Sequence, residues 1–359
     1  MKHLFLILIS LFLVSCTEEP VENDSTPIIE NVLYFPPNSG EWETMSMSDA
    51  NFDESNVENL LTYLEEKNTK GFIVLKNGKI VIEEYFNGHS QTTNHYWASA
   101  AKTLTGTVVG IAQEEGYLDI ANDTSDFLGT GWTSLTDEQE QIITIKHQLS
   151  MTSGLNDEID TDCTVPVCLT YMADAGTRWA YHNAPYTVLQ DVITSATEQS
   201  FRTYFETKLK DPIGMDGFWF TYMEYLEVYS SSTRSMARFG LLALNDFKWN
   251  ETPILNDISY VNAAINTSQD LNKSYGYLWW LNGKESYMLP HTQYNFTGSL
   301  IPAAPDDMYM AMGRNDQRIY VIPSKKIVII RMGDRAYEAD LTLSTFDNEL
   351  WEKLNVVID

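Results

Sequence analysis

The sequence predicts an α+β fold in which one antiparallel sheet takes strands from both ends of the chain. The two early strands form a predicted hairpin, because Asn77-Gly78 separates two apolar runs and this dipeptide is a strong hairpin signal. Three more strand-like segments follow late in the chain. The five segments cover residues 71–75, 79–85, 308–313, 318–322 and 327–332. We therefore expect a five-stranded antiparallel sheet with a helical lobe, about residues 97–290, inserted between its second and third strands.

Helices are expected to flank this sheet from both ends of the domain. Residues 55–66 place apolar side chains at helical spacing, and so does the C-terminal segment. The apolar positions are Val57, Leu60, Leu61 and Leu64 in the first helix and Leu343, Phe346, Leu350 and Leu354 in the last. The inserted lobe is mostly helical in pattern, and we predict no long alternating strand within it.

Residues 1–15 have the features of a lipoprotein signal peptide. A charged start at Lys2 precedes a short apolar core. That core is short for a bilayer span and lacks a basic stop-transfer flank, which argues against the alternative of a single-pass helix. The residues before Cys16 (Leu-Val-Ser) resemble a lipobox, whose cysteine is acylated after cleavage. We expect an extracytoplasmic protein held on a bacterial membrane by Cys16, with an acidic, disordered tether over residues 16–40 and one domain over 41–359.

The chain is strongly acidic, with a formal net charge of −27 over 359 residues. This charge argues against nucleic acids and anionic membrane surfaces as partners, since both would be repelled. An acidic surface on an extracytoplasmic protein is the simpler interpretation. The hydrophobic content of 43% is ample for a large core.

Two cysteines besides Cys16 lie close together, at Cys163 and Cys168. In an oxidising compartment such a pair indicates a local disulfide. Free thiols and a metal site are the alternatives. The metal site is disfavoured because no histidine pair with ligand spacing lies nearby, and we expect no metal and no organic cofactor.

Ser99 and Lys102 form the Ser-x-x-Lys of this chain, and they point to nucleophilic catalysis. A serine hydroxyl needs a nearby group to take its proton at neutral pH. The segment after Ser99 is helical in pattern and should end near Gly116. Residues three apart share a helix face, so the Lys102 amine should lie one turn from the Ser99 hydroxyl. Ser99 itself should lie at the helix N-terminus, where free N–H groups favour a developing anion.

A second proton carrier is expected beside this pair, and Tyr181 is the candidate. A phenol near a protonated lysine can lose its proton below its usual pKa of about 10. Asn183, two residues on, could hold the lysine or a substrate carbonyl. The Tyr-x-Asn pattern also occurs at Tyr85 and Tyr260, on a predicted strand end and in a predicted helix. From this pattern, the three tyrosines remain open, and Tyr181 could be an ordinary half-buried aromatic.

Several segments together resemble the serine β-lactamase and penicillin-binding-protein superfamily. The branch they resemble is class C-like and includes esterases and 6-aminohexanoate-dimer hydrolases. The matching segments, in the order of that branch, are residues 97–106 around Ser-x-x-Lys, 145–155 ending in Ser-Gly-Leu, 175–183 with Tyr-His-Asn, 211–215 (Asp-Pro-Ile-Gly-Met) and 236–242 (Met-Ala-Arg-Phe-Gly-Leu-Leu). The resemblance extends over about residues 55–355.

This resemblance implies a β-lactamase/transpeptidase-like fold and a set of roles. Ser99 would be the acylated nucleophile, Lys102 and Tyr181 would share the general-base and general-acid work, and Asn183 would have a supporting polar role. The resemblance therefore favours Tyr181 over the two rival tyrosines.

The third motif of the superfamily, Lys-Thr-Gly or His-Thr-Gly, is absent. The segments nearest to it, 291–293 and 296–298, do not appear in a predicted regular strand. Residues 310–317 fit the strand position and resemble the corresponding segment of the 6-aminohexanoate-dimer hydrolase branch, with Asp316 replacing a glycine. In that register Gly313 allows close approach of the backbone to substrate. The N–H groups of Ser99 and Arg314 would then form the oxyanion hole.

These inferences predict a lipid-anchored serine hydrolase (an esterase or amidase) that acts on a small neutral ester or linear amide through an acyl-enzyme. A β-lactamase or D-Ala-D-Ala carboxypeptidase is the rival among enzymes, and a catalytically silent binding protein on the same scaffold is the rival outside them. The apolar third-motif strand favours neutral substrates, because it offers no cation to a substrate carboxylate.

Overall fold

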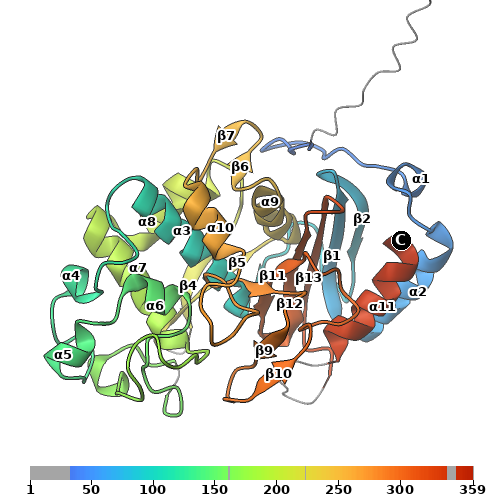
Figure 1. The fold of residues 1–359 in the computed structure, drawn as a ribbon. Coiled ribbons are helices and arrows are strands. Elements are labelled where there is room, and N and C mark those ends of the chain that lie inside the picture. Colours follow the sequence, from blue (N-terminus) through green and yellow to red (C-terminus); the bar gives the residue numbers. More distant parts are fainter. Residues whose placement is uncertain (1–32, 161, 223, 338–344, 359) are drawn as a thin grey trace, which may run out of the picture. The chain divides into compact units, whose positions relative to one another are not determined.

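A central antiparallel sheet of six strands, in the order β2-β1-β13-β12-β11-β8, organises the computed structural model (Figure 1). The structure describes residues 33–160, 162–222, 224–337 and 345–358. The strands of the central sheet are β1 (Thr69–Lys76), β2 (Lys79–Tyr85), β8 (Trp280–Leu281), β11 (Tyr309–Gly313), β12 (Gln317–Ile322) and β13 (Ile327–Gly333). The predicted pairing of early with late strands is confirmed by the antiparallel register of β1 with β13, in which Ile73 lies opposite Ile330.

The sheet has one strand more than the sequence predicted. β8 is two residues long, and it pairs with the outer edge of β11 at Tyr309 and Met310. A strand this short shows no alternation of apolar and polar residues, so the sequence pattern could not reveal it. The hairpin between β1 and β2 is as predicted. Asn77 and Gly78 both have positive φ, as a two-residue turn of this kind requires.

Helices cover both faces of the sheet (Figure 1). On one face, α2 (Val57–Glu66) and α11 (Phe346–Ile358) pack together, with the ring of Tyr63 stacked on that of Phe346. On the other face, α9 (Thr233–Leu244) contacts β13, β12 and β1. The predicted helix at 55–66 is therefore confirmed, as is the final helix from Phe346 onward. Leu343 lies outside the described residues.

The lobe between β2 and β8 carries most of the other helices and several short strands. Its helices are α3 (Lys102–Glu114), α4 (Ser125–Leu128), α5 (Asp137–Glu140), α6 (Ile145–Leu149), α7 (Asn183–Thr197), α8 (Phe201–Phe205) and α10 (Ile258–Ala264), and α1 (Met47–Ala50) precedes the sheet. Its strands are β3 (His95–Tyr96), β4 (Phe218–Tyr222), β5 (Leu226–Ser231), β6 (Lys248–Trp249) and β7 (Thr252–Pro253), and β9 (Ser286–Met288) and β10 (Asn295–Thr297) follow β8.

The lobe also contains a hairpin of β4 and β5, which the sequence pattern did not predict. It pairs over five residues and is joined by β3 to form a second sheet. The strand β4 is almost entirely aromatic, so its sequence shows no alternation of apolar and polar residues that would have predicted a strand. In the structure the Trp219 side chain is buried, whereas that of Phe218 is half-exposed.

The end of the predicted tether is held against the domain. Tyr34 donates its N–H to the Asn77 carbonyl at 2.9 Å, and the Arg238 guanidinium donates to the Pro36 carbonyl at 3.1 Å. Residues 33–40 thus belong structurally to the domain that was predicted to begin at residue 41. Cys16 and the predicted signal peptide lie outside the described residues.

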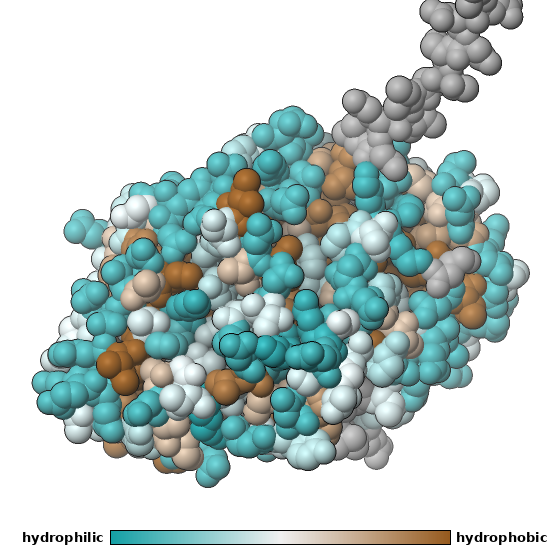
Figure 2. Space-filling view, in the orientation of Figure 1, coloured by the Kyte–Doolittle hydropathy of each residue, from teal (hydrophilic) through white to brown (hydrophobic). Residues whose placement is uncertain are grey.

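The visible surface is largely hydrophilic, with apolar side chains in small separate groups (Figure 2). This distribution agrees with the high negative charge of the sequence. Within the part of the chain that the structure describes, no helix has the length and apolar character needed to cross a membrane.

Candidate active site

Ser99 lies in a short 3₁₀ turn, η2 (Ala98–Ala101), that leads directly into α3. Trp97, the residue before this turn, is held by two hydrogen bonds. Its indole N–H donates to Ser231 Oγ at 2.8 Å, and its backbone N–H donates to the Tyr229 carbonyl at 2.8 Å. Ala98 has a positive φ of 48°, a conformation that costs a residue with a Cβ about 1–2 kcal/mol. The surroundings therefore hold the nucleophile turn in a strained geometry.

Lys102 is buried, with 2% of its surface exposed, and its amine contacts the nucleophile. Its Nζ donates to Ser99 Oγ at 2.9 Å and to Asn183 Oδ1 at 2.6 Å. The rings of Tyr181 and Tyr186 lie 4.9 and 4.1 Å from Nζ. Burial lowers the pKa of Lys102 to about 7, although the negative charge of Asp162 acts in the opposite direction. A large fraction of this amine is therefore unprotonated at neutral pH and can accept a proton.

Tyr181 completes the group, but with a different protonation state from the one predicted. Its ring stacks on Trp280 at 5.6 Å between centroids. Burial raises its pKa well above the usual value, and a hydrogen bond with the Ser99 side chain only partly offsets this. The expected ready loss of the phenol proton is therefore wrong. The apolar surroundings penalise a phenolate, and Lys102, with its lowered pKa, is not a permanent cation.

Asn183 is the first residue of α7, and its amide bridges two groups. Oδ1 accepts from Lys102, and Nδ2 donates to Asp162 Oδ1 at 2.7 Å. Asp162 is not among the site residues that the sequence predicts. The signal available was weak: an acidic residue directly before Cys163, in a segment predicted to carry a disulfide.

The two rival tyrosines make contacts of other kinds. The Tyr85 hydroxyl donates to Glu83 at the end of β2, and the buried Tyr260 of α10 donates to the Gly106 carbonyl at 2.6 Å. Of the three candidates, Tyr181 is the one that the structure brings to Ser99 and Lys102.

Gly313 ends β11 beside the nucleophile turn. A Cβ at this position would lie 2.3 Å from the Trp97 carbonyl oxygen and 3.0 Å from the Ala100 nitrogen. The close approach that this glycine permits in the structure is to the chain's own backbone around Ser99. Because a side chain here would push strand and turn apart, Gly313 positions the end of β11 against the nucleophile.

Arg314 follows Gly313, and its side chain is exposed at the start of the turn η5 (Arg314–Asp316). The next residue, Asn315, has a positive φ of 59° and its amide donates to the Tyr96 hydroxyl. On β11 itself, Ala311 is buried and Met312 is half-buried, so the strand offers no charged side chain at these positions.

The segments nearest to the missing third motif lie elsewhere. Residues 291–293 form no strand, and the Gln293 amide donates to the Trp179 carbonyl at 3.1 Å. Phe296 and Thr297 belong to the short strand β10, which pairs with β9 outside the central sheet. The expectation that no regular strand carries them is therefore wrong, although this strand is too short to show alternation.

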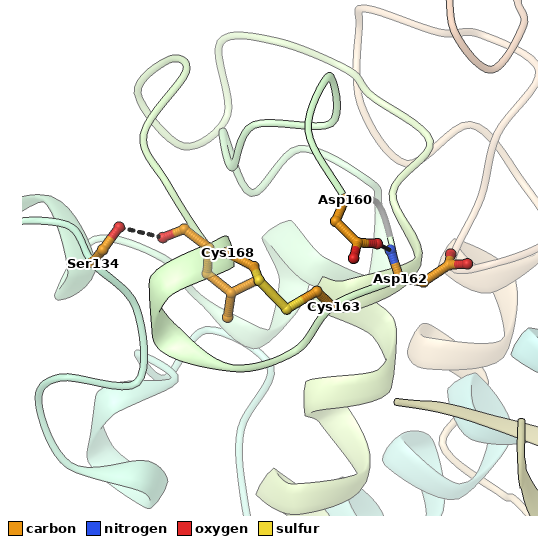
Figure 3. The surroundings of a disulfide bond; sticks show 6 residues. Ser134, Asp160, Asp162, Cys163 and Cys168 are labelled. Carbon is orange, nitrogen blue, oxygen red and sulfur yellow. Dashed lines mark hydrogen bonds between the residues drawn. A yellow bond between two sulfur atoms is a disulfide. The ribbon is translucent and has the colours of Figure 1, made fainter. Parts of the chain in front are cut away.

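Cys163 and Cys168 form a disulfide in the loop that carries Asp162 (Figure 3). Asp157, at the start of this loop, pairs with Arg178 at 2.6 Å. Among the described residues, no group of three or more His, Cys, Asp or Glu side chains could hold a metal ion.

Residues 63–348 match the sequence profile of the family described as Beta-lactamase. The chain belongs to the beta-lactamase family. The matched range includes the whole central sheet and every residue of the site described above. Family membership places the protein in a superfamily of serine hydrolases and confirms the fold class that the motifs implied.

Solved structures agree on the fold. The chain is similar to one described as "Putative 6-aminohexanoate-dimer hydrolase from Bacillus anthracis", with a TM-score of 0.68 and 19% identity, covering 90% of this chain and 88% of that chain. It is also similar to a penicillin binding protein from Bacillus halodurans, with a TM-score of 0.61 and 16% identity, covering 82% of this chain and 99% of that chain.

Among curated proteins, protein flp of Staphylococcus aureus is 26% identical over 181 residues, which are 43% of this chain and 36% of that protein. The match thus spans about a third of the length of this relative.

Proposed function

We propose that the protein hydrolyses small neutral esters or linear amides through an acyl-enzyme on Ser99. The observation that carries the proposal is the Lys102 amine, which lies 2.9 Å from the Ser99 hydroxyl and has a pKa of about 7. A general base works best when its pKa lies near the operating pH. A binding protein has no need of a buried amine of lowered pKa beside a serine hydroxyl, which argues against a silent binding protein.

Acylation begins when unprotonated Lys102 takes the proton of Ser99 as Oγ attacks the substrate carbonyl. The carbonyl oxygen becomes an anion in the tetrahedral intermediate, and the backbone N–H groups of Ser99 and Arg314 are the proposed oxyanion hole. One such donor typically contributes ~10²–10³-fold in rate. The contact of Gly313 with the nucleophile turn supports this pairing of donors.

Tyr181 then serves as the proton donor to the leaving group. Its raised pKa keeps the phenol protonated at neutral pH, and it hydrogen-bonds with Ser99. The leaving alcohol or amine departs with the phenol proton of Tyr181. Lys102 then gives Tyr181 the proton that it had taken from Ser99. In deacylation a water molecule attacks the acyl-enzyme ester. The water proton passes to Tyr181 as the phenol proton passes to Lys102, and Lys102 gives a proton to the departing Ser99 Oγ.

Neutral substrates are proposed because the strand beside the nucleophile is apolar. A substrate carboxylate next to Ala311 and Met312 would lose its hydration without gaining a charged partner, which is costly. Arg314 is a nearby cation, but it follows the strand on an exposed turn. Family membership favours one second candidate, a β-lactamase or D-Ala-D-Ala carboxypeptidase.

A substrate panel with intact-mass detection tests both candidates. Short-chain esters, linear amides, β-lactams and D-alanyl peptides are each incubated with wild type and with Ser99→Ala. We expect ester or amide turnover and one acyl adduct on Ser99, both absent from Ser99→Ala. A kcat/KM of about 10⁴ M⁻¹s⁻¹ or more on cephalosporins would instead favour the second candidate. Stoichiometric acylation at Ser153 would contradict the nucleophile assignment.

We also propose that the hydrolase works outside the cytoplasm on a lipid anchor at Cys16. The lipobox-like sequence before this cysteine supports the proposal. Wild type should partition into the detergent phase, whereas Cys16→Ser should become soluble or remain unprocessed. Equal aqueous partitioning of the two would contradict the anchor.

A further inference from the structure

A chain of three hydrogen bonds runs from the disulfide loop to the nucleophile. Asp162 Oδ1 accepts from Asn183 Nδ2 at 2.7 Å, Asn183 Oδ1 accepts from Lys102 Nζ at 2.6 Å, and Lys102 Nζ donates to Ser99 Oγ at 2.9 Å. Asp162 touches neither Ser99 nor Lys102 through these bonds, and the roles proposed above do not use it. The chain includes the Lys102 amine, which takes the Ser99 proton in the proposed reaction.

The carboxylate decides which way the Asn183 amide faces. An ionised carboxylate only accepts hydrogen bonds, so it requires the NH₂ end of the amide. The oxygen end is then turned toward Lys102, where it accepts an N–H. An unprotonated amine has two N–H groups and one lone pair. With one N–H directed at Asn183, the lone pair can point toward Ser99.

The loop that carries Asp162 is held by the disulfide directly after it. Cys163, the next residue, is buried and bonded to Cys168, and the Asp162 N–H donates to Asp160 Oδ1 at 3.2 Å (Figure 3). Beyond the disulfide, Ser134 Oγ donates to the Leu169 carbonyl at 3.1 Å. A short closed loop of this kind holds the carboxylate in place without a helix or strand.

We propose that Asp162 is a positioning residue of the hydrolase, which orients Asn183 and through it the Lys102 amine, and that the Cys163–Cys168 disulfide holds the carboxylate where it does so. This inference rests on the proposed function, because it needs Lys102 to act on Ser99. It adds to that function a residue that acts through Asn183.

The charge of Asp162 also acts on Lys102. It opposes the effect of burial and so keeps the pKa of the amine higher than burial alone would. The other titratable groups that face Lys102 are Tyr181 and Tyr186, which stay neutral because burial raises their pKa values, and His182, whose pKa burial lowers to about 4. At neutral pH, Asp162 is therefore the charged group that tunes this amine.

Asp162→Asn separates positioning from folding, because it keeps the size of the side chain and removes its charge and its fixed acceptor character. We expect kcat to fall ~10²-fold with KM little changed, as for misplacement of a catalytic group by about 1 Å. The rise of kcat/KM with pH should move to lower pH, since the Lys102 pKa falls when the negative charge is removed. Glu158→Gln, an exposed carboxylate on the same loop, is the matched control and should behave as wild type.

The disulfide is tested by replacing both cysteines. Cys163→Ala/Cys168→Ala should lower kcat in the same direction, and adding Asp162→Asn to it should cost less than Asp162→Asn costs alone. Such non-additivity is the sign of two changes acting through one element. Thermal unfolding of each variant shows whether the domain remains folded.

The outcomes distinguish this inference from the function beneath it. Asp162→Asn with wild-type kcat, or with a lower kcat and an unmoved pH profile, would overturn the positioning role even while Ser99→Ala is inactive. Full additivity with the cysteine double variant would overturn the part assigned to the disulfide. Full activity in Ser99→Ala would overturn the proposed function itself.

Discussion

Two buried cations in this protein have opposite electrostatic surroundings. Arg318 on β12 and Lys102 at the start of α3 are exposed by only 3% and 2%. Arg318 meets the Asp347 carboxylate of α11 through two hydrogen bonds, at 2.6 and 2.8 Å, and Asp316 at 3.0 Å. Lys102 donates instead to a hydroxyl and an amide oxygen.

The difference in partners accounts for the opposite directions in which the two pKa values move from their ordinary values, which already differ between lysine and arginine. The carboxylates raise the pKa of Arg318 despite its burial, whereas burial lowers that of Lys102 to about 7. Burial alone therefore does not mark a functional cation. A buried lysine with neutral partners can therefore give up its proton near neutral pH. A buried arginine keeps its proton even with neutral partners, since Arg331 donates to backbone carbonyls and burial lowers its pKa only to about 10.

The largest expected effect is on the catalytic side of the comparison. Lys102→Met should lower kcat/KM at least ~10²-fold, the usual loss for a general base, because Lys102 is the amine that lies 2.9 Å from the Ser99 hydroxyl. Its free energy of unfolding should not fall, since Met fills the same volume without a buried amine. Ester or amide turnover and urea unfolding are the measurements.

A Lys102→Met variant that unfolds at a much lower urea concentration than wild type would contradict this view. It would mean that the amine is held as a structural cation, as Arg318 is.

At the structural cation Arg318 we expect the reverse: a loss of stability with little change in catalytic rate. Asp347→Ala leaves Arg318 buried without the carboxylate that accepts two of its hydrogen bonds, and should cost ~3–5 kcal/mol of stability. The catalytic rate of the fraction that remains folded should change little. Asp334→Ala, which removes an exposed partner of Lys70, is the control and should cost ~1 kcal/mol or less.

Comparing urea midpoints of the two variants with wild type checks this prediction. Equal losses in Asp347→Ala and Asp334→Ala would show that the buried pair does not matter more than a surface pair.

These two sites also differ in how much of them the sequence could predict. Ser99 and Lys102 are three residues apart, so helix geometry alone brings them together. The strands around Arg318 are largely apolar, and their predicted bounds agree with the structure within one or two residues. Asp162 and Asn183 are joined across an irregular loop, where no period relates sequence to space. The burial of Tyr181, which raises its pKa, depends on Trp179, Tyr275 and Trp280, and the last two reach it from segments distant in the sequence.

The disulfide should contribute a smaller amount of stability. Cys163 and Cys168 are five residues apart, so the closed loop is short and its removal should cost about 2 kcal/mol, the lower end of the usual range. Cys163→Ala/Cys168→Ala measured by urea unfolding tests this value. Alkylation of the unfolded protein before reduction provides the control, because the wild type should show no reactive thiol at either position.

The last prediction concerns the pH dependence of kcat/KM, which should change tenfold per pH unit. If unprotonated Lys102 is the base, kcat/KM rises tenfold per unit below pH about 7 and reaches a plateau above it. Stability should follow the same group. In the unfolded chain the amine titrates at its usual 10.5, so between pH 7 and 10.5 the unfolded state binds one proton more and the contribution of Lys102 to stability rises with pH.

Lys102→Met should remove that rise, while Arg318, with its raised pKa, stays charged over the whole range and adds no slope. Unfolding free energies at pH 6, 7.5 and 9 for wild type and Lys102→Met provide the test. If the two proteins show the same slope, or if kcat/KM is flat from pH 5 to 9, then Lys102 carries its proton throughout. The neutral partners at the site would then not be what separates the catalytic cation from the structural one.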